Sequence, residues 1–456
     1  MAGRVAADGA GASEPAQGPA PLTGAYAGYA MTLLLCLYLV NFLDRQVVHI
    51  LGEPIKRDLH LADWQLGLMS GLAFALLYTI LGIPIAWLAE RRSRPAIIGA
   101  AATVWSGFTL LCGMAQSFPQ LVLARIGVGV GEAGCTPAAQ SLIMDYARPE
   151  KRSSALAYYG LGAPIGGLVG MAFGGLVADA YGWRAAFLVA GLPGLVLGAL
   201  AAFTLREPRR AMARRVAEAK AEGPGVSETF RHLLSKPAFV NWAAALMLMS
   251  LPLAALPPFL GSFYLRNHAD GLARLAEAAG STFGVHLQSV GVLGLSLGLI
   301  LGTSGALGMW LGGQIADRFG RGSPRRYAQG AALATVLGAP LMIAAVIAPT
   351  LELSLALLAL KGVVWSLWYG AGYAAGFSVV PRNMRATASA LSLFINNLVG
   401  TGFGAVAVGA LSDLIGTRLG SGEGVRWSIV VFSLCGAGAA VMFLRAARTI
   451  EAEAAE

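Results

Sequence analysis

Long apolar runs recur along the whole chain, and short polar stretches separate them. The runs lie at about residues 25–51, 65–89, 95–116, 119–145, 153–178, 185–205, 238–264, 285–316, 327–349, 352–380, 386–412 and 427–446. Each is long enough for an α-helix to cross the hydrocarbon core of a bilayer, which takes about 20 residues. None shows the alternation that marks a transmembrane β-strand. The pattern predicts an all-α integral membrane protein with twelve transmembrane helices.

Composition and charge support this prediction and give it an orientation. Only 12% of the residues are charged, about half the share in soluble domains, which excludes an ordinary soluble protein. Of the 33 lysines and arginines, 23 fall in stretches on the side of the N-terminus and 7 on the other side. Because such residues accumulate in cytoplasmic loops, both termini are expected in the cytoplasm. The net charge of +9 follows from this bias and does not indicate nucleic-acid binding.

The chain divides into two similar halves. We expect a disordered cytoplasmic tail, a six-helix bundle, a basic cytoplasmic linker, a second six-helix bundle and a short tail, at residues 1–24, 25–205, 206–237, 238–446 and 447–456. The sequence Ala-Glu-Arg that ends at Arg91 has a counterpart, Ala-Asp-Arg, that ends at Arg318, 227 residues later. Parallel halves that hold a substrate between them at the bilayer midplane are a known transporter plan. The Ala-, Gly- and Arg-rich composition indicates a GC-rich bacterium, and therefore its inner membrane.

The loop after the eighth run carries the motif G-x-x-x-D-R-x-G-R, formed by Gly313, Asp317, Arg318, Gly320 and Arg321. It resembles the signature loop of the major facilitator superfamily. The copy in the first half is degenerate and keeps Glu90, Arg91 and Arg94. The stretches 125–131 (R-I-G-V-G-V-G) and 182–184 (G-W-R) are also similar to features of the superfamily. The resemblance implies a central cavity lined by spans one, four, seven and ten.

The carboxylates of these two loops are expected to gate the cavity. Asp317, at the cytoplasmic end of span eight, would lie against the positive N-terminal dipole of span five, and Glu90 would do the same for span eleven. Each contact contributes about 0.3–1 kcal/mol and would stabilise the state that is closed to the cytoplasm. The alternative is that Arg318 and Arg321 only fix the topology.

Three further stretches indicate which family within the superfamily the chain resembles. They are 41–46 (N-F-L-D-R-Q), 127–133 (G-V-G-V-G-E-A) and 206–210 (R-E-P-R-R). Together they are similar to the Spinster family. Anion–cation symporters of the same superfamily share runs like the first two, and the third favours Spinster. The resemblance implies a carrier of lysophospholipids or sphingoid lipids that uses a proton gradient.

Four ionisable residues fall within the first and fourth spans, where each costs about 2.5–3.5 kcal/mol near the bilayer centre. Asp44 and Arg45 belong to the first span. Arg125 and Glu132 share one face of the fourth span with Thr136. We hypothesise that the two acids carry the proton, while the two arginines alternate between these acids and an anionic headgroup. The alternative is a permanent structural cluster of salt bridges.

The tenth span supplies a lysine and several aromatic residues. Spacing places residues 361, 365, 368 and 369 on one helical face. The cavity wall is therefore expected to contain Asn41, His49, Thr136, Trp365, Trp368, Tyr369 and Tyr373, with Lys361 as a further headgroup partner. The alternatives are that the aromatic residues pack between helices, that Lys361 extends outward, and that His49 is a satisfied polar residue near the outer mouth.

The sequence contains no phosphate-binding loop, hydrolase triad or metal-ligand spacing, so we expect no enzymatic activity, cofactor or metal. We predict a monomeric, proton-coupled secondary transporter of an amphipathic, lipid-like substrate. The alternatives are a symporter of small organic anions, a multidrug exporter, and a membrane lipid-binding sensor or scramblase.

Overall fold

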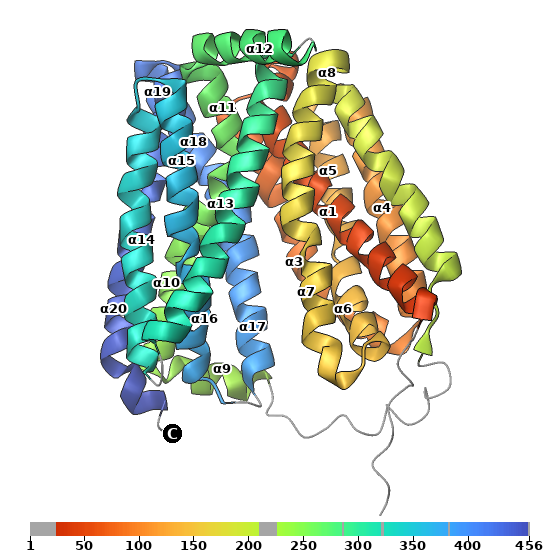
Figure 1. Ribbon diagram of the computed structural model, residues 1–456, viewed down its shortest axis with the longest axis vertical. Coiled ribbons are helices and arrows are strands. Elements are labelled where there is room, and N and C mark those ends of the chain that lie inside the picture. The colour runs from red at the N-terminus through yellow and green to blue at the C-terminus, as the bar shows by residue number, and fades with distance from the viewer. Residues whose placement is uncertain (1–23, 209–225, 285–286, 321–322, 382–383, 455–456) are drawn as a thin grey trace, which may run out of the picture.

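The computed structural model describes residues 24–208, 226–284, 287–320, 323–381 and 384–454. This part of the chain contains helices and no strand (Figure 1). In the first half the helices are α1 (Gly24–Leu59), α2 (Asp63–Gly67), η1 (Leu68–Leu72), α3 (Ala73–Arg91), α4 (Arg94–Met114), α5 (Phe118–Glu132), α6 (Cys135–Tyr146), η2 (Pro149–Lys151), α7 (Arg152–Gly160) and α8 (Gly162–Thr204). The predicted tail up to residue 23 and the motif residue Arg321 lie outside the described residues.

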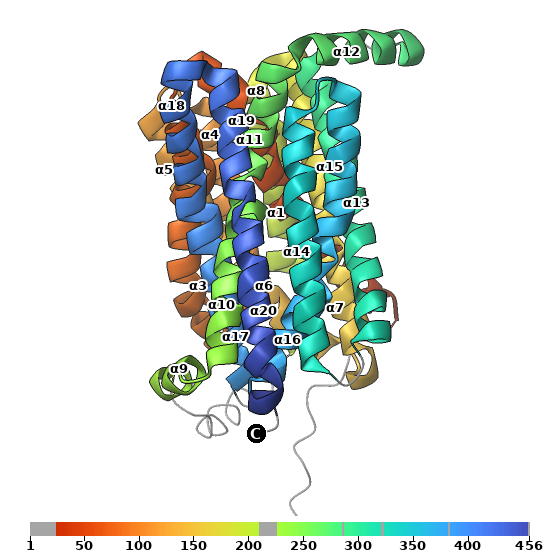
Figure 2. The ribbon, with the colours of Figure 1, turned by 90° about the vertical axis from the view of Figure 1, so that its left-hand side faces the viewer.

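The second half begins after a short helix, α9 (Val226–Leu234), that falls within the predicted linker. Its helices are α10 (Pro237–Ser250), η4 (Leu251–Ala255), α11 (Pro257–Asn267), α12 (Ala269–Phe283), α13 (Ser289–Phe319), α14 (Pro324–Ile347), α15 (Leu351–Ser366), α16 (Trp368–Ser378), α17 (Arg385–Phe394), η6 (Ile395–Gly404), α18 (Ala405–Leu419), α19 (Ser421–Ser433) and α20 (Cys435–Ala454). Helices α9 and α12 lie across the long helices at opposite ends of the molecule (Figures 1 and 2).

Twelve spans result, as the apolar runs predict. Within the described ranges, ten continuous helical stretches are long and apolar enough to cross a membrane. One of them, Arg152–Thr204, holds two spans, because Gly182 turns the chain with a φ of +82°, a conformation that glycine adopts without steric cost. The fourth span is absent from the ten because it is divided between α5 and α6. The fold-class prediction is therefore confirmed.

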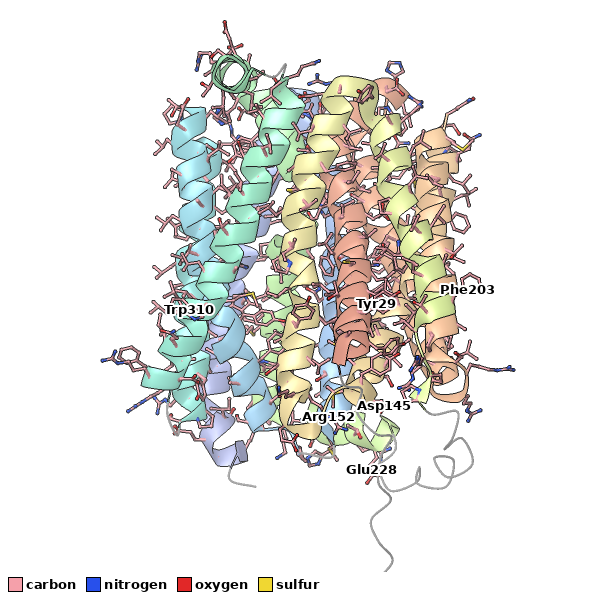
Figure 3. The ribbon with its side chains drawn as sticks, turned by 45° about the vertical axis from the view of Figure 1, so that its right-hand side comes forward. Tyr29, Asp145, Arg152, Phe203, Glu228 and Trp310 are labelled. Carbon is pink, nitrogen blue, oxygen red and sulfur yellow. The ribbon has the colours of Figure 1, made fainter. Side chains whose placement is uncertain are left out.

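The outside of the bundle is apolar. Phe203 and Trp310 are 87% and 60% exposed, and both lie on the outer side of the helices (Figure 3). Asp145 and Arg152 lie instead at the end where α9 and the end of α20 are found. We call this end the terminal face and the opposite end the α12 face. Apolar side chains between two polar faces are what a helical bundle in a bilayer requires.

The two halves share one core at the α12 face and have separate cores at the terminal face. One cluster of buried residues joins Leu43 and Phe187 of the first half to Phe259 and Leu293 of the second. A second cluster, which includes Trp242, Ala331, Trp368 and Phe443, belongs to the second half alone. The bundle is therefore packed shut across the two halves near α12.

Small residues allow the two halves to approach closely. Helices α8 and α13 run side by side, and a Cβ atom added at Gly298 of α13 would lie 2.7 Å from the carbonyl oxygen of Leu168 on α8. Since real Cβ atoms essentially never approach so closely, a larger residue would push the two backbones apart. Glycine thus sets the distance between the fifth and eighth spans, as expected for helices packed in lipid.

Candidate functional site

Four charged side chains, three of them buried, form a charge network inside the first half. Asp44 and Arg45 come from α1, and Arg125 and Glu132 come from α5. Nε and Nη2 of Arg45 each lie 2.6 Å from Oε2 of Glu132. The hydroxyl of Thr109 on α4 donates to Oδ2 of Asp44 at 2.6 Å. Asp44, Arg125 and Glu132 are each only 1% exposed, whereas the side chain of Arg45 is 21% exposed, so three of the four charged groups are withdrawn from water.

Aromatic rings surround the guanidinium group of Arg45. Its Cζ atom lies 4.7 Å from the ring centre of Phe74, 4.8 Å from Tyr78 and 5.3 Å from Phe42. Cζ of Arg125 also lies 5.5 Å from the Phe74 ring. Contacts of this kind stabilise a desolvated cation by up to about 2 kcal/mol. Arg45 therefore has stabilising neighbours besides Glu132.

Several atoms of the network are buried without a hydrogen-bond partner among the described residues. They are Oδ1 of Asp44, Oε1 of Glu132, Nε and Nη1 of Arg125, and both side-chain polar atoms of Asn41. A buried polar atom without a partner costs about 1–3 kcal/mol, and such groups call for an explanation such as a catalytic role, a strain reservoir or a bound water. The network is thus only partly satisfied, which a permanent structural cluster would avoid.

A separate, mostly apolar cavity of about 680 Å³ lies beside this network. Its wall is built by α1, α8, η4, α11, α13, α14 and α15, with α7 contributing one residue. The lining residues are Phe42, Gln46, Gly160, Ala163, Pro164, Gly167, Met171, Pro252, Leu253, Leu256, Pro257, Leu260, Leu301, Gly302, Ser304, Gly305, Ala306, Met309, Met342, Leu358, Lys361, Gly362, Trp365 and Ser366. Among these described residues, Lys361 is the one ionisable side chain.

Some of the residues predicted for the cavity wall line this cavity, and others lie away from it. Lys361 and Trp365 line the cavity, whereas Asn41 and the four charged residues lie inside the first half next to it. His49 is half-buried and its Nδ1 lies 3.1 Å from Oε1 of Gln46, which does line the cavity. Thr136 is half-buried at the start of α6. Gln46 thus connects the cavity to the side chain of His49.

Of the other aromatic residues of the tenth span, Trp368 is buried in the core of the second half, Tyr373 is half-buried against that core, and Tyr369 is 43% exposed. Trp368 stacks on Tyr373 at 5.8 Å, and Tyr369 lies 5.0 Å from Tyr373. The indole N–H of Trp242 on α10 donates to the carbonyl of Gly372 at 2.8 Å, which draws α10 onto α16. Trp368 and Tyr373 therefore contact neighbouring helices, and none of the three is among the residues that line the cavity.

Arg94 of the degenerate motif is enclosed within the first half. It is fully buried, and Nη1 lies 2.7 Å from Oδ2 of Asp145 and 3.0 Å from the carbonyl of Ser141. Its backbone N–H donates to Glu207 at 2.8 Å, and its Nη2 lies 2.5 Å from the same carboxylate. Glu207 belongs to the R-E-P-R-R stretch, so that stretch anchors the end of the sixth span to the third and fourth.

The remaining motif residues lie at the terminal end of the second and eighth spans. Gly313, Asp317 and Arg318 are in the last turns of α13, and Gly320 follows that helix. Cζ of Arg318 lies 6.0 Å from the Phe319 ring. Arg91 ends α3, whereas nothing is described of the Glu90 side chain.

An ionic cluster that the sequence analysis missed joins the halves at the α12 face. Arg266, at the end of α11, lies 2.7 Å from Glu53 of α1 and 2.7 Å from Asp63 of α2. Lys56 also lies 2.5 Å from Asp63, and Ser412 of α18 donates to Asp63 at 2.6 Å. The side chains of Arg266, Glu53 and Asp63 are 6%, 6% and 2% exposed. From the sequence alone, Arg266 is expected only as a cation in a loop outside the membrane, because no helical spacing links residues 53, 63 and 266.

Two carboxylates at the same face cap helices of the opposite half. Asp413 of α18 accepts hydrogen bonds from the backbone amides of Asp63 and Trp64, which begin α2. Asp179 of α8 accepts from the backbone amides of Gln288 and Gly291 at the start of α13, each at 2.8 Å. A carboxylate at a helix N-terminus satisfies free amides and the helix dipole. Both caps hold the α12 face closed.

Two six-helix halves, closed on one face around an apolar cavity with a buried charge network beside it, define a membrane transporter. Comparison with known protein families also indicates a membrane transporter. The family model of the Major Facilitator Superfamily matches residues 34–405. The chain belongs to this superfamily, as its signature loop predicts.

The similar proteins include transporters of the Spinster group. A crystal structure of a bacterial homolog to the human lysosomal transporter Spinster, in an inward-facing and unoccupied conformation, is 28% identical, with a TM-score of 0.81 over 95% of this chain and 99% of that one. Protein spinster homolog 1 of Xenopus tropicalis is 27% identical over 86% of this chain and 75% of that protein. An MFS-type efflux pump of Mycolicibacterium smegmatis is 30% identical over 90% of each chain. The predicted resemblance to Spinster is confirmed.

Proposed function

We propose that the protein is a proton-coupled, alternating-access carrier of an amphipathic, lipid-like substrate, a lysophospholipid or a sphingoid phosphate. The observation that carries the proposal is the partly satisfied acid–arginine network beside a large apolar cavity. Ionisable residues within a membrane are expensive and are functional by default. A network whose polar atoms are incompletely paired can exchange partners, which a proton switch requires.

Glu132 and Asp44 are the proposed proton sites. A proton on Glu132 would weaken its ion pair with Arg45, since a neutral carboxyl group attracts the guanidinium less strongly. Arg45 would then turn toward other acceptors while the Phe74 and Tyr78 rings stabilise it. Asp44 would bind its proton beside Thr109 and within the electrostatic reach of Arg125. The two acids couple through the arginines between them.

The cavity favours an amphipathic substrate over a small hydrophilic one. Its wall is almost entirely aliphatic, glycine and proline, with few polar groups, and sites for lipid-like or drug-like ligands have this composition. A probable L-galactonate transporter of Escherichia coli matches over only 37% of this chain, and a sugar acid would leave most of this wall unused. The relative from Mycolicibacterium smegmatis is an MFS-type efflux pump, and multidrug export is the second candidate, because an apolar wall also accepts hydrophobic drugs.

The orientation and the cytoplasmic gate are part of the same proposal. With the terminal face toward the cytoplasm, the α12-face contacts would close the outer side of the carrier. Asp317, Arg318 and the matching residues of the first half would close the terminal face in the opposite state, as the signature loop of the superfamily implies. The proposed carrier is monomeric and lies in a bacterial inner membrane.

Uptake into proteoliposomes tests the proposal. Wild-type protein is expected to take up a labelled lysophospholipid when a pH gradient is imposed and to exchange it for unlabelled substrate without a gradient. The variants E132Q and D44N are expected to lose the gradient-driven uptake while keeping exchange. D270N, the same acid-to-amide change at the exposed Asp270 of α12, serves as the matched control. Gradient-driven uptake that is unchanged in both acid variants would place the proton site elsewhere, and the absence of exchange in wild type would favour a sensor.

A further inference from the structure

Three hydrogen-bond donors on the cavity wall of the second half lack acceptors. Lys361 on α15 has no ion pair among the described residues, and its Nζ lies 4.9 Å from the ring centre of Trp365. Ser304 on α13 and Trp365 on α15 are 5% and 4% exposed. The hydroxyl of Ser304 and the indole N–H of Trp365 are buried without a hydrogen-bond partner in the described part of the chain.

These donors come from adjacent positions of two packed helices. Trp365 follows Lys361 by one helical turn. A Cβ atom added at Gly362 would overlap Oγ of Ser304, so this hydroxyl lies directly against the residue that follows Lys361. Helices α13 and α15 pack side by side, and all three residues line the same cavity. An ammonium, a hydroxyl and an indole N–H therefore belong to neighbouring residues in one part of the wall.

A group that only accepts hydrogen bonds and carries negative charge would satisfy this set. Buried donors without acceptors carry a desolvation penalty, and an anionic oxygen bonds such donors more strongly than a neutral one does. No carboxylate is among the described residues of the cavity wall. A positive charge on the substrate would therefore meet Lys361 without any counter-ion.

We propose that Lys361, Ser304 and Trp365 form a subsite for one negative charge, which selects amphiphiles with a net single negative charge over zwitterions of the same chain length. This inference rests on the proposed function and deepens it. The anionic group, a phosphodiester or a carboxylate, binds at this subsite, and the acyl chain extends along the aliphatic wall. The charge network of the first half is left free for protons.

Equilibrium binding to the purified full-length chain tests the subsite. The probes are lysophosphatidylglycerol, which is monoanionic, lysophosphatidylcholine with the same acyl chain, which is zwitterionic, and glycerol 3-phosphate, which has no chain. Wild type is expected to bind the first roughly tenfold more tightly than the second. K361M should remove this preference by weakening lysophosphatidylglycerol alone, and K361R should restore most of it. S304A and W365F should each reduce the preference several-fold, whereas T303V, a change at an exposed residue of α13 that does not line the cavity, should not.

Each outcome either supports the subsite or contradicts a named part of the proposals. Equal weakening of both lysolipids by K361M, or no preference in wild type, overturns the subsite. Binding of glycerol 3-phosphate as tight as that of lysophosphatidylglycerol overturns the lipid as the source of the anion and retains the anion subsite. Because binding is measured without a pH gradient, its result can contradict the anion subsite without contradicting proton-coupled transport. The proteoliposome experiment can do the reverse. A Lys361-dependent preference without exchange in proteoliposomes removes the transport function alone, and exchange without the preference removes the subsite alone.

Discussion

Asp413 of the eleventh span accepts hydrogen bonds from the backbone amide of Asp63, at 2.9 Å, and of the residue after it, and so caps the second span. Asp179 does the same for the eighth span from the end of the fifth. The two caps are 234 positions apart, close to the 227 that separate the signature loops. The internal repeat therefore provides one helix-capping carboxylate in each half at the α12 face.

Replacing Asp413 by asparagine should loosen the α12 face. The amide keeps the shape of the side chain but loses its charge at the N-terminus of α2, an interaction of about 1 kcal/mol, or roughly a fivefold shift in a two-state equilibrium. A cysteine at Leu260, in a chain without its four native cysteines, would report the change. Its rate of labelling by a membrane-impermeant maleimide added at the α12 face should rise in D413N. D270N, an exposed change on α12, is the control, and equal rates would show that the cap does not hold the face closed.

Loss of Arg266 should destabilise the protein far more. R266M removes the guanidinium group that the buried carboxylates of Glu53 and Asp63 share, and among the described residues these keep only Arg57 and Lys56 as cationic partners. We expect a loss of about 3 kcal/mol, the lower end of the range for breaking a buried ion pair. The measurement is thermal unfolding in detergent. R266K should be intermediate, because lysine cannot bind two carboxylates with a rigid fork. Adding E53Q to R266M should recover part of the loss; a double variant no more stable than R266M would argue against charge as the cause.

Arg94 is expected to be equally intolerant of lysine. R94K keeps the charge but cannot bind the Glu207 carboxylate through two nitrogens while also contacting Asp145 and Ser141. We expect a loss of about 2–4 kcal/mol, in the range for damage to a buried network, seen as a lower unfolding temperature. The exposed change R184K at the opposite face, where an ion pair to Asp58 is preserved, should change stability by less than about 1 kcal/mol. Similar losses in the two variants would contradict the anchoring role of Arg94.

Alanine at Gly298 should separate the fifth and eighth spans. Its Cβ atom meets the backbone of Leu168, which cannot move away as a flexible side chain can, so overpacking of about 1–3 kcal/mol is expected. Gly313 is the matched control on the same helix, because nothing lies within 4 Å of a Cβ placed there. G313A should be neutral or up to about 1 kcal/mol more stable through its helix propensity. Unfolding temperatures that fall equally in both variants would show that the α8–α13 contact is not the cause.

The fold could be predicted from the sequence because the membrane imposes a length and a polarity on every span. Asp44, Arg45, Arg125 and Glu132 could be assigned to one neighbourhood for the same reason, since each is costly in lipid and needs partners. Which acid pairs with which arginine could not be predicted. That choice depends on the rotation of α1 against α5, which packing of the Phe74 ring helps to set.

The aromatic residues show the limit of helical spacing as a guide. Spacing grouped Trp365 and Trp368 correctly on one side of the tenth span, but it does not say what that side meets. Trp242, far away in the sequence, donates to the carbonyl of Gly372 and packs against Gly376, and Phe443 of the last span packs against Trp368. Ser304 gave no signal at all, because a serine among glycines in a membrane helix is ordinary. Its place in the proposed subsite rests on its contact with Gly362, which brings together two helices.

The π-helical stretches η1, η4 and η6 interrupt the second, seventh and eleventh spans where these helices contact one another. Each π turn accommodates one residue more than an α turn, and one residue corresponds to about 100° of rotation around a helix. The part of a span beyond such a stretch therefore presents a different stripe of its sequence to its neighbours than the part before it. A single-residue deletion within η6 would realign the two stripes, and the eleventh span would then direct Asp413 away from the helix that it caps.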